Sequence, residues 1–153
     1  PILEEGLSMV PGISDAGGLR IIREYAEAIP KVMGAAHQLK QAFYSLITNA
    51  RDAMKEGGTL FLRLSTFLIN DTSFVRVEVE DTGSGIDPEK LHHIFNPFYT
   101  TKEASLGLGL PIVHKIITSH QGKIEVENHP GEGINFIITL PAAPEGKGKE
   151  VDR

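Results

Sequence analysis

Alternating apolar and polar residues mark most of the strands that the sequence predicts. Val75, Val77 and Val79 lie on one face of a segment that ends at Asp81, and charged residues separate them. Similar patterns predict strands over residues 19–25, 31–33, 59–67, 75–81, 123–127 and 134–140. Turn residues at 70–73 and 129–133 join the last four of these into two hairpins.

Apolar residues at spacings of three and four predict the helices. The clearest helix runs from Ala36 to Lys55 and ends at a glycine pair, Gly57 and Gly58. Another is expected to begin near Pro111, because proline suits the first helical turn, and to end at 121–122. Shorter helices are expected over residues 2–10 and 87–95.

Length and composition indicate one folded domain. The chain has 153 residues, of which 41% are hydrophobic, enough for a single core. We expect this domain to span residues 1–141. Residues 142–153 carry little apolar side chain and are expected to form a disordered C-terminal tail.

Charge and residue usage exclude several classes of protein. The chain has no cysteine, which excludes disulfides, thiolate metal sites and cysteine nucleophiles. A formal net charge of −5 argues against a nucleic-acid-binding protein. No apolar run approaches the ~18 residues of a membrane span, and no signal peptide is recognised, so a cytoplasmic location is expected.

A carboxylate followed by two glycines is the first candidate site. Asp81 lies where a strand ends, and Gly83 and Gly85 follow in a loop before Asp87 and Pro88 open a helix. Glycines let a backbone approach a ligand closely because they lack Cβ. The carboxylate of Asp81 could therefore accept a hydrogen bond from an amine of a bound heterocycle.

Polar side chains on the long helix form the second candidate site. At ~100° per residue, Ser45, Asn49 and Asp52 share one stripe of the helix, beside its apolar face. An amide oxygen is a ligand that suits Mg²⁺, so we expect Asn49 to bind that ion. For Ser45 and Asp52, a position on the protein surface is an alternative explanation to a role in binding.

The segment between the two main helices is the third candidate site. Residues 95–105 lack any period and predict a loop or lid, from which Lys102 is expected to reach a phosphate. Gly107 and Gly109 then precede the helix expected at Pro111. Free backbone N–H groups at a helix N-terminus form a phosphate site.

These motifs, in this order, resemble the catalytic and ATP-binding domain of sensor histidine kinases of the nitrogen-regulation type. The resemblance covers residues 2–141 and includes the Gly131–Gly133 turn. It implies an α/β fold, the GHKL or histidine-kinase ATPase fold. That fold is a two-layer sandwich of a mixed, largely antiparallel sheet and about three main helices, with a flexible ATP lid.

The resemblance also implies roles for individual residues. Asn49 would ligate Mg²⁺ through the nucleotide phosphates, and Asp81 would bind the exocyclic amine of adenine. Asn49 and Lys102 are the residues that it implies for catalysis. The full set implied for binding ATP is Ser45, Asn49, Asp52, Asp81, Gly83, Gly85, Ile86, Phe98, Thr101, Lys102, Gly107, Leu108, Gly109 and Leu110.

Four positions depart from the family pattern. Ser45 replaces a frequent asparagine, and Asp52 stands where a basic or amide residue is common. Ser105 and Leu106 replace a Gly-Thr pair. These changes bear on the affinity for ATP, and they leave open a degenerate nucleotide-binding module that docks a partner.

The function expected is transfer of the γ-phosphoryl group of Mg-ATP to a histidine on a separate dimerisation domain. None of the six histidines here is followed by an acidic residue, as a phosphoacceptor would be. The expected partners are that domain and a response-regulator receiver domain, with this chain a monomer and the whole kinase a homodimer. An ATPase of the same fold is the alternative, but it would need a glutamate general base where Ser45 stands.

Overall fold

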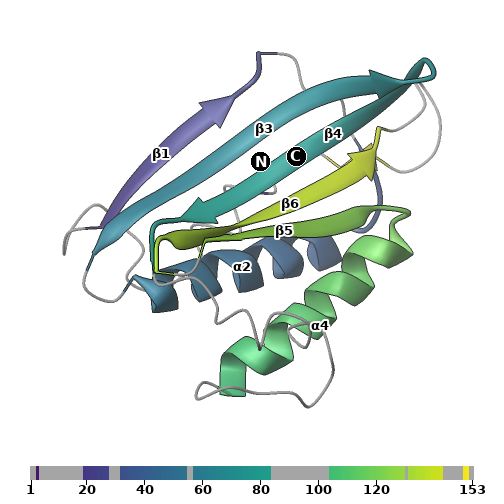
Figure 1. Cartoon of the computed structure of the whole chain (residues 1–153). Coiled ribbons are helices and arrows are strands. Elements are labelled where there is room, and N and C mark those ends of the chain that lie inside the picture. The colour runs from purple at the N-terminus through teal and green to yellow at the C-terminus, as the bar shows by residue number, and fades with distance from the viewer. Residues whose placement is uncertain are drawn as a thin grey trace.

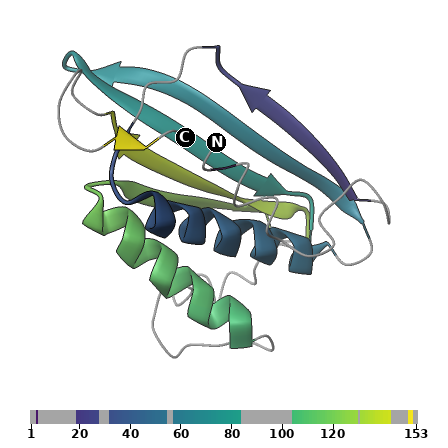
Figure 2. The same cartoon turned by 180° about the vertical axis from the view of Figure 1, so that it is seen from behind.

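A five-stranded sheet carries both main helices on one face (Figures 1 and 2). The computed structural model describes residues 3, 19–27, 32–54, 57–83, 104–129, 131–142 and 150–151. Its elements are β1 (Leu19–Tyr25), β2 (Val32–Met33), α2 (Ala36–Ala53), β3 (Gly58–Ile69), β4 (Thr72–Asp81), α4 (Ala104–Ser119), β5 (Lys123–His129), β6 (Gly133–Pro141) and β7 (Glu150–Val151).

The strand order is β1-β3-β4-β6-β5. Only β1 and β3 run parallel in this sheet, and the other neighbouring strands are antiparallel. The two-layer, mixed and largely antiparallel fold expected from the sequence is confirmed. The predicted strands are present, and both hairpins form where they were expected.

The core lies between the sheet and the two helices. Alternate residues of β3 and β4 face the helices, as the pattern of leucines and valines predicted. The largest of the described side chains that are exposed by less than 2% are Leu3, Leu39, Leu46, Ile47, Leu60, Leu62, Leu110, Ile117, Ile138, Val75, Val77 and Val79. This packing fixes α2 against β4 and α4 against α2.

The turn between β3 and β4 is tight. Asn70 and Asp71 have φ angles of 51° and 67°. Two successive positive φ angles are typical of a type I′ turn, whose twist matches that of the flanking strands. Asparagine and aspartate tolerate this backbone, which explains their presence there.

Helix α4 begins earlier than the sequence predicted. We expected its first turn at Pro111, but the helix starts at Ala104 and has Pro111 in its interior. Pro111 has no N–H to donate to the carbonyl of Gly107 one turn earlier. The glycine-rich stretch through Gly107 and Gly109 is therefore helical, and the expectation of a non-helical turn there is wrong.

Parts of the predicted ends and lid lie outside the described residues. Leu3 is helical and buried, and the remainder of the expected 2–10 helix is not described. The expected 87–95 helix and the 95–103 part of the expected lid also lie outside. In the tail, Glu150–Val151 pair with Val32–Met33, so these two residues depart from the expected disorder. Among the described helices, none is long and apolar enough to cross a membrane.

The end of α4 gives a test of backbone strain. Gln121 has a φ angle of 58°, and the N–H of Gly122 donates to the carbonyl of Ile117 at 2.9 Å, as in a Schellman motif. We expect Gln121→Gly to raise the free energy of unfolding by about 1 kcal/mol, because glycine adopts this backbone without strain.

Urea unfolding at equilibrium measures that change. Gly122→Ala is the contrasting variant, because a Cβ at Gly122 would lie 2.7 Å from Cδ2 of Leu140. An unchanged or lower stability of Gln121→Gly would contradict the analysis of this helix end.

Candidate functional site

Asp81 is buried at the end of β4, where only 4% of the residue is exposed. Its Oδ1 accepts a hydrogen bond from the backbone N–H of Gly83 at 2.9 Å. The strand alternation directs its side chain to the helix side of the sheet, together with Val77 and Val79. A buried carboxylate is rare without a charged partner.

Burial raises the pKa of the Asp81 carboxyl from its ordinary value of 3.8 to about 6. The backbone N–H groups of Gly83 and Ile134 act in the opposite direction and lower this pKa. The charge of the neighbouring Glu80 raises it further. The removal of water therefore outweighs the two donors, and a carboxyl with this raised pKa is typical of a functional site.

The backbone after Asp81 lies against the C-terminal end of α2. A Cβ at Gly83 would overlap the carbonyl oxygen of Ala53, so only glycine fits there. We expected Gly83 to admit a ligand, whereas the structure gives it a packing reason. The contact places the end of β4 against the last turn of α2, one turn after Asn49.

Thr82 holds the end of β4 to two neighbouring segments, and the sequence analysis did not find this role. Its hydroxyl oxygen accepts a hydrogen bond from the N–H of Thr59 at 2.9 Å and donates to Sδ of Met54 at 3.8 Å. The residue thus connects the end of β4 with the start of β3 and the end of α2. A threonine after a strand carries no signal that predicts these non-local partners.

Gly133 is a second close contact at Asp81. It has a φ angle of 123°, and a Cβ there would overlap the carbonyl oxygen of Asp81. The adjacent Ile134 pairs with Asp81 across β4 and β6. The Gly131–Gly133 turn was recognised in the sequence, but the need for glycine at 133 follows only from this contact.

The polar stripe of α2 forms as expected. Ser45, Asn49 and Asp52 are all half-buried on this helix. Asp52 pairs with Arg51, whose Nη2 lies 3.1 Å from Oδ1 of the carboxylate. The negative charge of Asp52 is thereby partly compensated, which reduces its repulsion of a phosphate.

The side-chain amide of Asn49 is suited to bind a metal–nucleotide complex. Its Nδ2 is buried and has no hydrogen-bond partner in the part of the chain that the structure describes. An unpaired buried N–H donor is unfavourable, which favours an acceptor such as a phosphate oxygen at Nδ2, whereas a cation would bind Oδ1. The described residues contain no group of three or more His, Asp or Glu that could hold a metal. Mg²⁺ at Asn49 would therefore depend on phosphate oxygens for further ligands.

The remaining predicted residues divide into two groups. Gly107, Leu108 and Gly109 lie in the N-terminal half of α4, and Leu110 is 1% exposed within the core, where it packs. Gly85, Ile86, Phe98, Thr101 and Lys102 lie outside the described residues. Their roles stay predictions.

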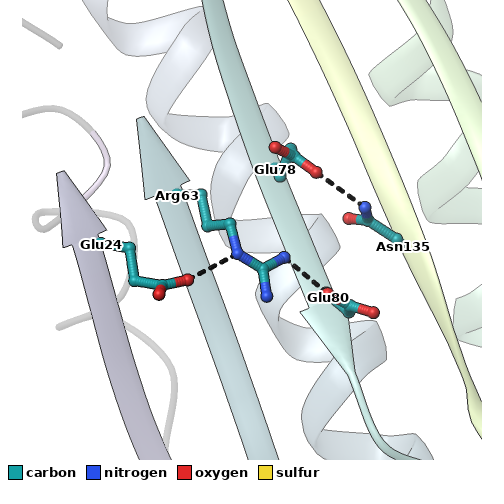
Figure 3. A network of polar contacts seen from close by, with 5 residues as sticks. All are labelled: Glu24, Arg63, Glu78, Glu80 and Asn135. Atoms are coloured by element: carbon teal, nitrogen blue, oxygen red, sulfur yellow. Dashed lines mark hydrogen bonds and ion pairs between the residues drawn. The ribbon is translucent and has the colours of Figure 1, made fainter. Parts of the chain in front are cut away.

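A polar network lies behind Asp81 on the sheet face opposite α2 and α4. Figure 3 shows Arg63 of β3 between Glu24 of β1 and Glu80 of β4, and the Arg63–Glu24 contact is 2.6 Å long. On the neighbouring strand, Asn135 donates to Glu78 at 2.9 Å. Because Glu80 precedes Asp81, Arg63 offsets a negative charge one residue away from the buried carboxylate.

Comparison with known proteins identifies the family and the fold. Residues 34–144 match the family described as histidine kinase-, DNA gyrase B-, and HSP90-like ATPase. The chain belongs to this family. The matched residues of this ATPase domain include the α2 stripe, Asp81 and α4. The resemblance to sensor histidine kinases found in the sequence is confirmed.

Curated relatives of the ATPase domain are histidine kinases. The chain is 32% identical to sporulation kinase E of Bacillus subtilis (strain 168) over 151 residues, which are 99% of the chain and 20% of that protein. It is 38% identical to the sensory histidine kinase/phosphatase NtrB of Rhodobacter capsulatus, covering 87% of the chain and 40% of the relative. The chain thus spans less than half the length of these relatives.

Solved structures agree with the sequence relatives. The catalytic domain of histidine kinase ThkA, in a nucleotide-free form, superposes with a TM-score of 0.80 at 30% identity, covering 94% of this chain and 93% of that one. Full-length ShkA in complex with AMPPNP gives a TM-score of 0.78 at 26% identity, with 94% of this chain and 30% of that chain covered. The ATPase domain therefore has the fold of histidine-kinase catalytic domains.

The raised pKa of Asp81 predicts a pH-dependent effect of Asp81→Asn. The carboxyl favours folding most below pH 3.8, where it is protonated in both the folded and the unfolded protein. That contribution to stability is lost as the pH rises through about 6. Asparagine does not ionise, so at pH 7.5 the variant should be more stable than the wild type by roughly 1–3 kcal/mol.

Urea unfolding at several pH values measures the difference, which should shrink toward zero as the pH falls from about 6.5 to 4. The same substitution at the exposed Asp71 is the control. A difference that does not change with pH would show that Asp81 is not a desolvated carboxylate.

The contact between Gly133 and Asp81 predicts unequal effects for two neighbouring glycines. Gly133→Ala should lower the free energy of unfolding by at least about 2 kcal/mol, because the new Cβ displaces the end of β4. Gly131 also has a positive φ angle, 80°, but nothing lies within 4 Å of its Cβ position, so Gly131→Ala is the matched control. Its expected loss is about 1 kcal/mol.

Denaturant unfolding of both variants measures these values. Equal losses at the two positions would mean that backbone strain alone accounts for Gly133.

Proposed function

We propose that this chain is the ATP-binding catalytic domain of a sensor histidine kinase. The single observation that supports it most is the buried carboxylate of Asp81, followed by backbone that packs on Ala53, one helical turn after Asn49 in α2. A carboxylate there accepts a hydrogen bond from the exocyclic amine of adenine. The phosphates then extend along α2 toward Asn49.

The chemistry in this proposal depends mainly on positioning and on charge neutralisation. Mg²⁺ at Asn49 supplies positive charge to the phosphate oxygens when it is bound. Asn49 orients the phosphates, and Lys102, which precedes α4 in the sequence, contacts them. The glycines at 107 and 109 provide backbone that packs close to the phosphates.

The phosphoryl acceptor in this proposal is a histidine outside this chain. Of the histidines in the described residues, His120 is buried, whereas His37, His114 and His129 are exposed but lack the acidic residue that follows a phosphoacceptor. The acceptor domain would dimerise the kinase and leave this domain monomeric. A receiver domain of a response regulator would then take the phosphoryl group, in the cytoplasm, where ATP is available.

Hydrolysis of ATP by this domain alone is not favoured. An ATPase of this fold would need a general base one turn before Asn49, and the half-buried Ser45 stands there. A serine hydroxyl does not take a proton from water at neutral pH. The proposal therefore assigns the γ-phosphoryl group to a histidine rather than to water.

Thermal melts with and without Mg-ATP test the nucleotide site. A ligand at about a hundred times its Kd stabilises the folded state by ~2.7 kcal/mol. This corresponds to an increase in Tm of roughly 5–10 °C for a domain of this size. Asp81→Asn should raise the Tm without ligand and abolish the shift, so stability and binding change in opposite directions.

Mg-GTP is the matched ligand control, because guanine carries an oxygen where adenine carries the amine. No shift with Mg-ATP in the wild type would refute nucleotide binding by this chain and would favour a partner-docking module. A shift that survives Asp81→Asn would place the adenine elsewhere.

A further inference from the structure

His120 is a buried histidine that the proposed function does not use. It follows the last residue of α4, and only 8% of it is exposed. Asp81, His120 and Asn135 are the buried polar residues in the part of the chain that the structure describes. The end of α4 that carries His120 lies beside the N-terminal end of α2 in both views (Figures 1 and 2).

The two ring nitrogens of His120 have partners of opposite kinds. Nδ1 lies 2.7 Å from the carbonyl oxygen of Ile116, and a carbonyl can only accept. Nε2 lies 3.0 Å from the backbone N–H of Ala35, which can only donate. These partners require the neutral ring with its proton on Nδ1, so the imidazole connects α4 to the residue before α2.

His120 takes the place of a cap on α2. Ala35 is the N-cap residue of that helix and has no side chain that can accept a hydrogen bond. In a capping box, a side chain in the first turn of the same helix accepts the N–H of the N-cap residue. Here the acceptor comes from another helix, 85 residues later in the chain.

Gly34 packs against the same edge of the ring that accepts the hydrogen bond from Ala35. A Cβ at Gly34 would overlap Cδ2 of His120 and would lie 2.7 Å from its Nε2. The ring therefore packs directly on the backbone that connects β2 to α2. Neither the ring nor that backbone can move without the other.

A small tilt of α4 at this contact would displace the opposite end of the helix. Gly109 is eleven residues before His120 in α4, about 16 Å away at 1.5 Å per residue. A tilt of about 5° at His120 would displace Gly109 by roughly 1.4 Å relative to α2. Displacements of about 1 Å are enough to impair a site that works by positioning.

We propose that His120 is a positioning residue for nucleotide binding. By holding the end of α4 on the start of α2, it sets the distance between the glycines of α4 and Asn49 of α2. The inference rests on the proposed function, because it assumes that both helices contact the phosphates. It assigns His120 no contact with the nucleotide.

Two substitutions of His120 separate positioning from filling of the core. His120→Leu fills the site with an apolar side chain of similar size and removes the acceptor for the N–H of Ala35. His120→Gln retains an oxygen that can reach the same N–H. The same exchange at the exposed His37 of α2, His37→Leu, is the control.

Calorimetric titration of each folded variant with Mg-ATP measures the Kd. We expect His120→Leu to weaken binding about tenfold and His120→Gln to stay within about threefold of the wild type. His37→Leu should not change the Kd. A Kd for folded His120→Leu equal to that of the wild type would overturn the inference, since a purely structural residue lowers stability without changing the affinity of the folded state.

A second measurement does not depend on nucleotide. The chain has no cysteine, so spin labels can be placed at Gln41→Cys and Lys115→Cys, which are exposed positions on α2 and α4. The distance distribution between the labels should broaden or shift in His120→Leu and return toward the wild type in His120→Gln. Gly34→Ala should produce the same change, which provides the test if His120→Leu does not fold.

The two measurements separate the failure of this inference from that of the proposed function. If the wild type does not bind Mg-ATP, the proposed function fails, and the inference for nucleotide binding fails with it. If the wild type binds but the helix distance in His120→Leu and Gly34→Ala is unchanged, the inference alone is overturned. A changed distance with an unchanged Kd also overturns it, because the position of α4 would then not control binding.

Discussion

The desolvation of one carboxylate is the constraint on which this site depends. Asp81 is buried at the end of β4 with no cation beside it among the residues that the structure describes, and two backbone N–H groups are its donors in place of a charge. One donor, Gly83, follows the end of β4, and the other, Ile134, lies near the start of β6, so these two strand ends must lie in close register. Gly83 against Ala53 and Gly133 against Asp81 are the contacts that allow this register. The contacts that fold this end of the sheet are therefore also the ones that set the geometry of the site.

The alternation of β4 extends this constraint to the far side of the sheet. Asp81 faces the helices, whereas the preceding Glu80 faces the opposite side, where Arg63 pairs with it. Arg63 also reaches Glu24 on the parallel edge strand β1. One arginine thus connects three strands directly behind the site. The Arg63–Glu24 pair is partly exposed, and such ion pairs add little stability. We regard as more relevant that Arg63 pairs with Glu80, whose charge raises the pKa of the neighbouring Asp81.

Local sequence patterns predicted the parts of the fold that depend on local physics. The alternating valines and leucines predicted β3 and β4, and the Asn70–Asp71 turn was expected from its residue types. The start of α4 was missed because Gly107, Gly109 and Pro111 all have low helix propensity, which the packing of Leu110 and Val113 in the core overrides.

The candidate site divides in the same way. The positions of Asp81 and of the α2 stripe could be predicted because a motif and a helical period depend on residues that are close together in the sequence. Thr82, Gly133 and His120 could not, because the partners that give them their roles are distant in the sequence. The strand pairing of Glu150–Val151 with Val32–Met33 was missed for this reason too. Composition alone does not indicate such a long-range pair.

The capping of α2 by His120 has a consequence for cooperativity. A helix that starts with an alanine N-cap and draws its acceptor from a residue 85 positions later is not completed by local interactions. The N-cap N–H of α2 gains its acceptor only when the end of α4 packs against it. The start of α2 thus depends on α4, which removes a natural point at which the domain could unfold in parts. The two helices and the sheet beneath them should form and melt as one unit.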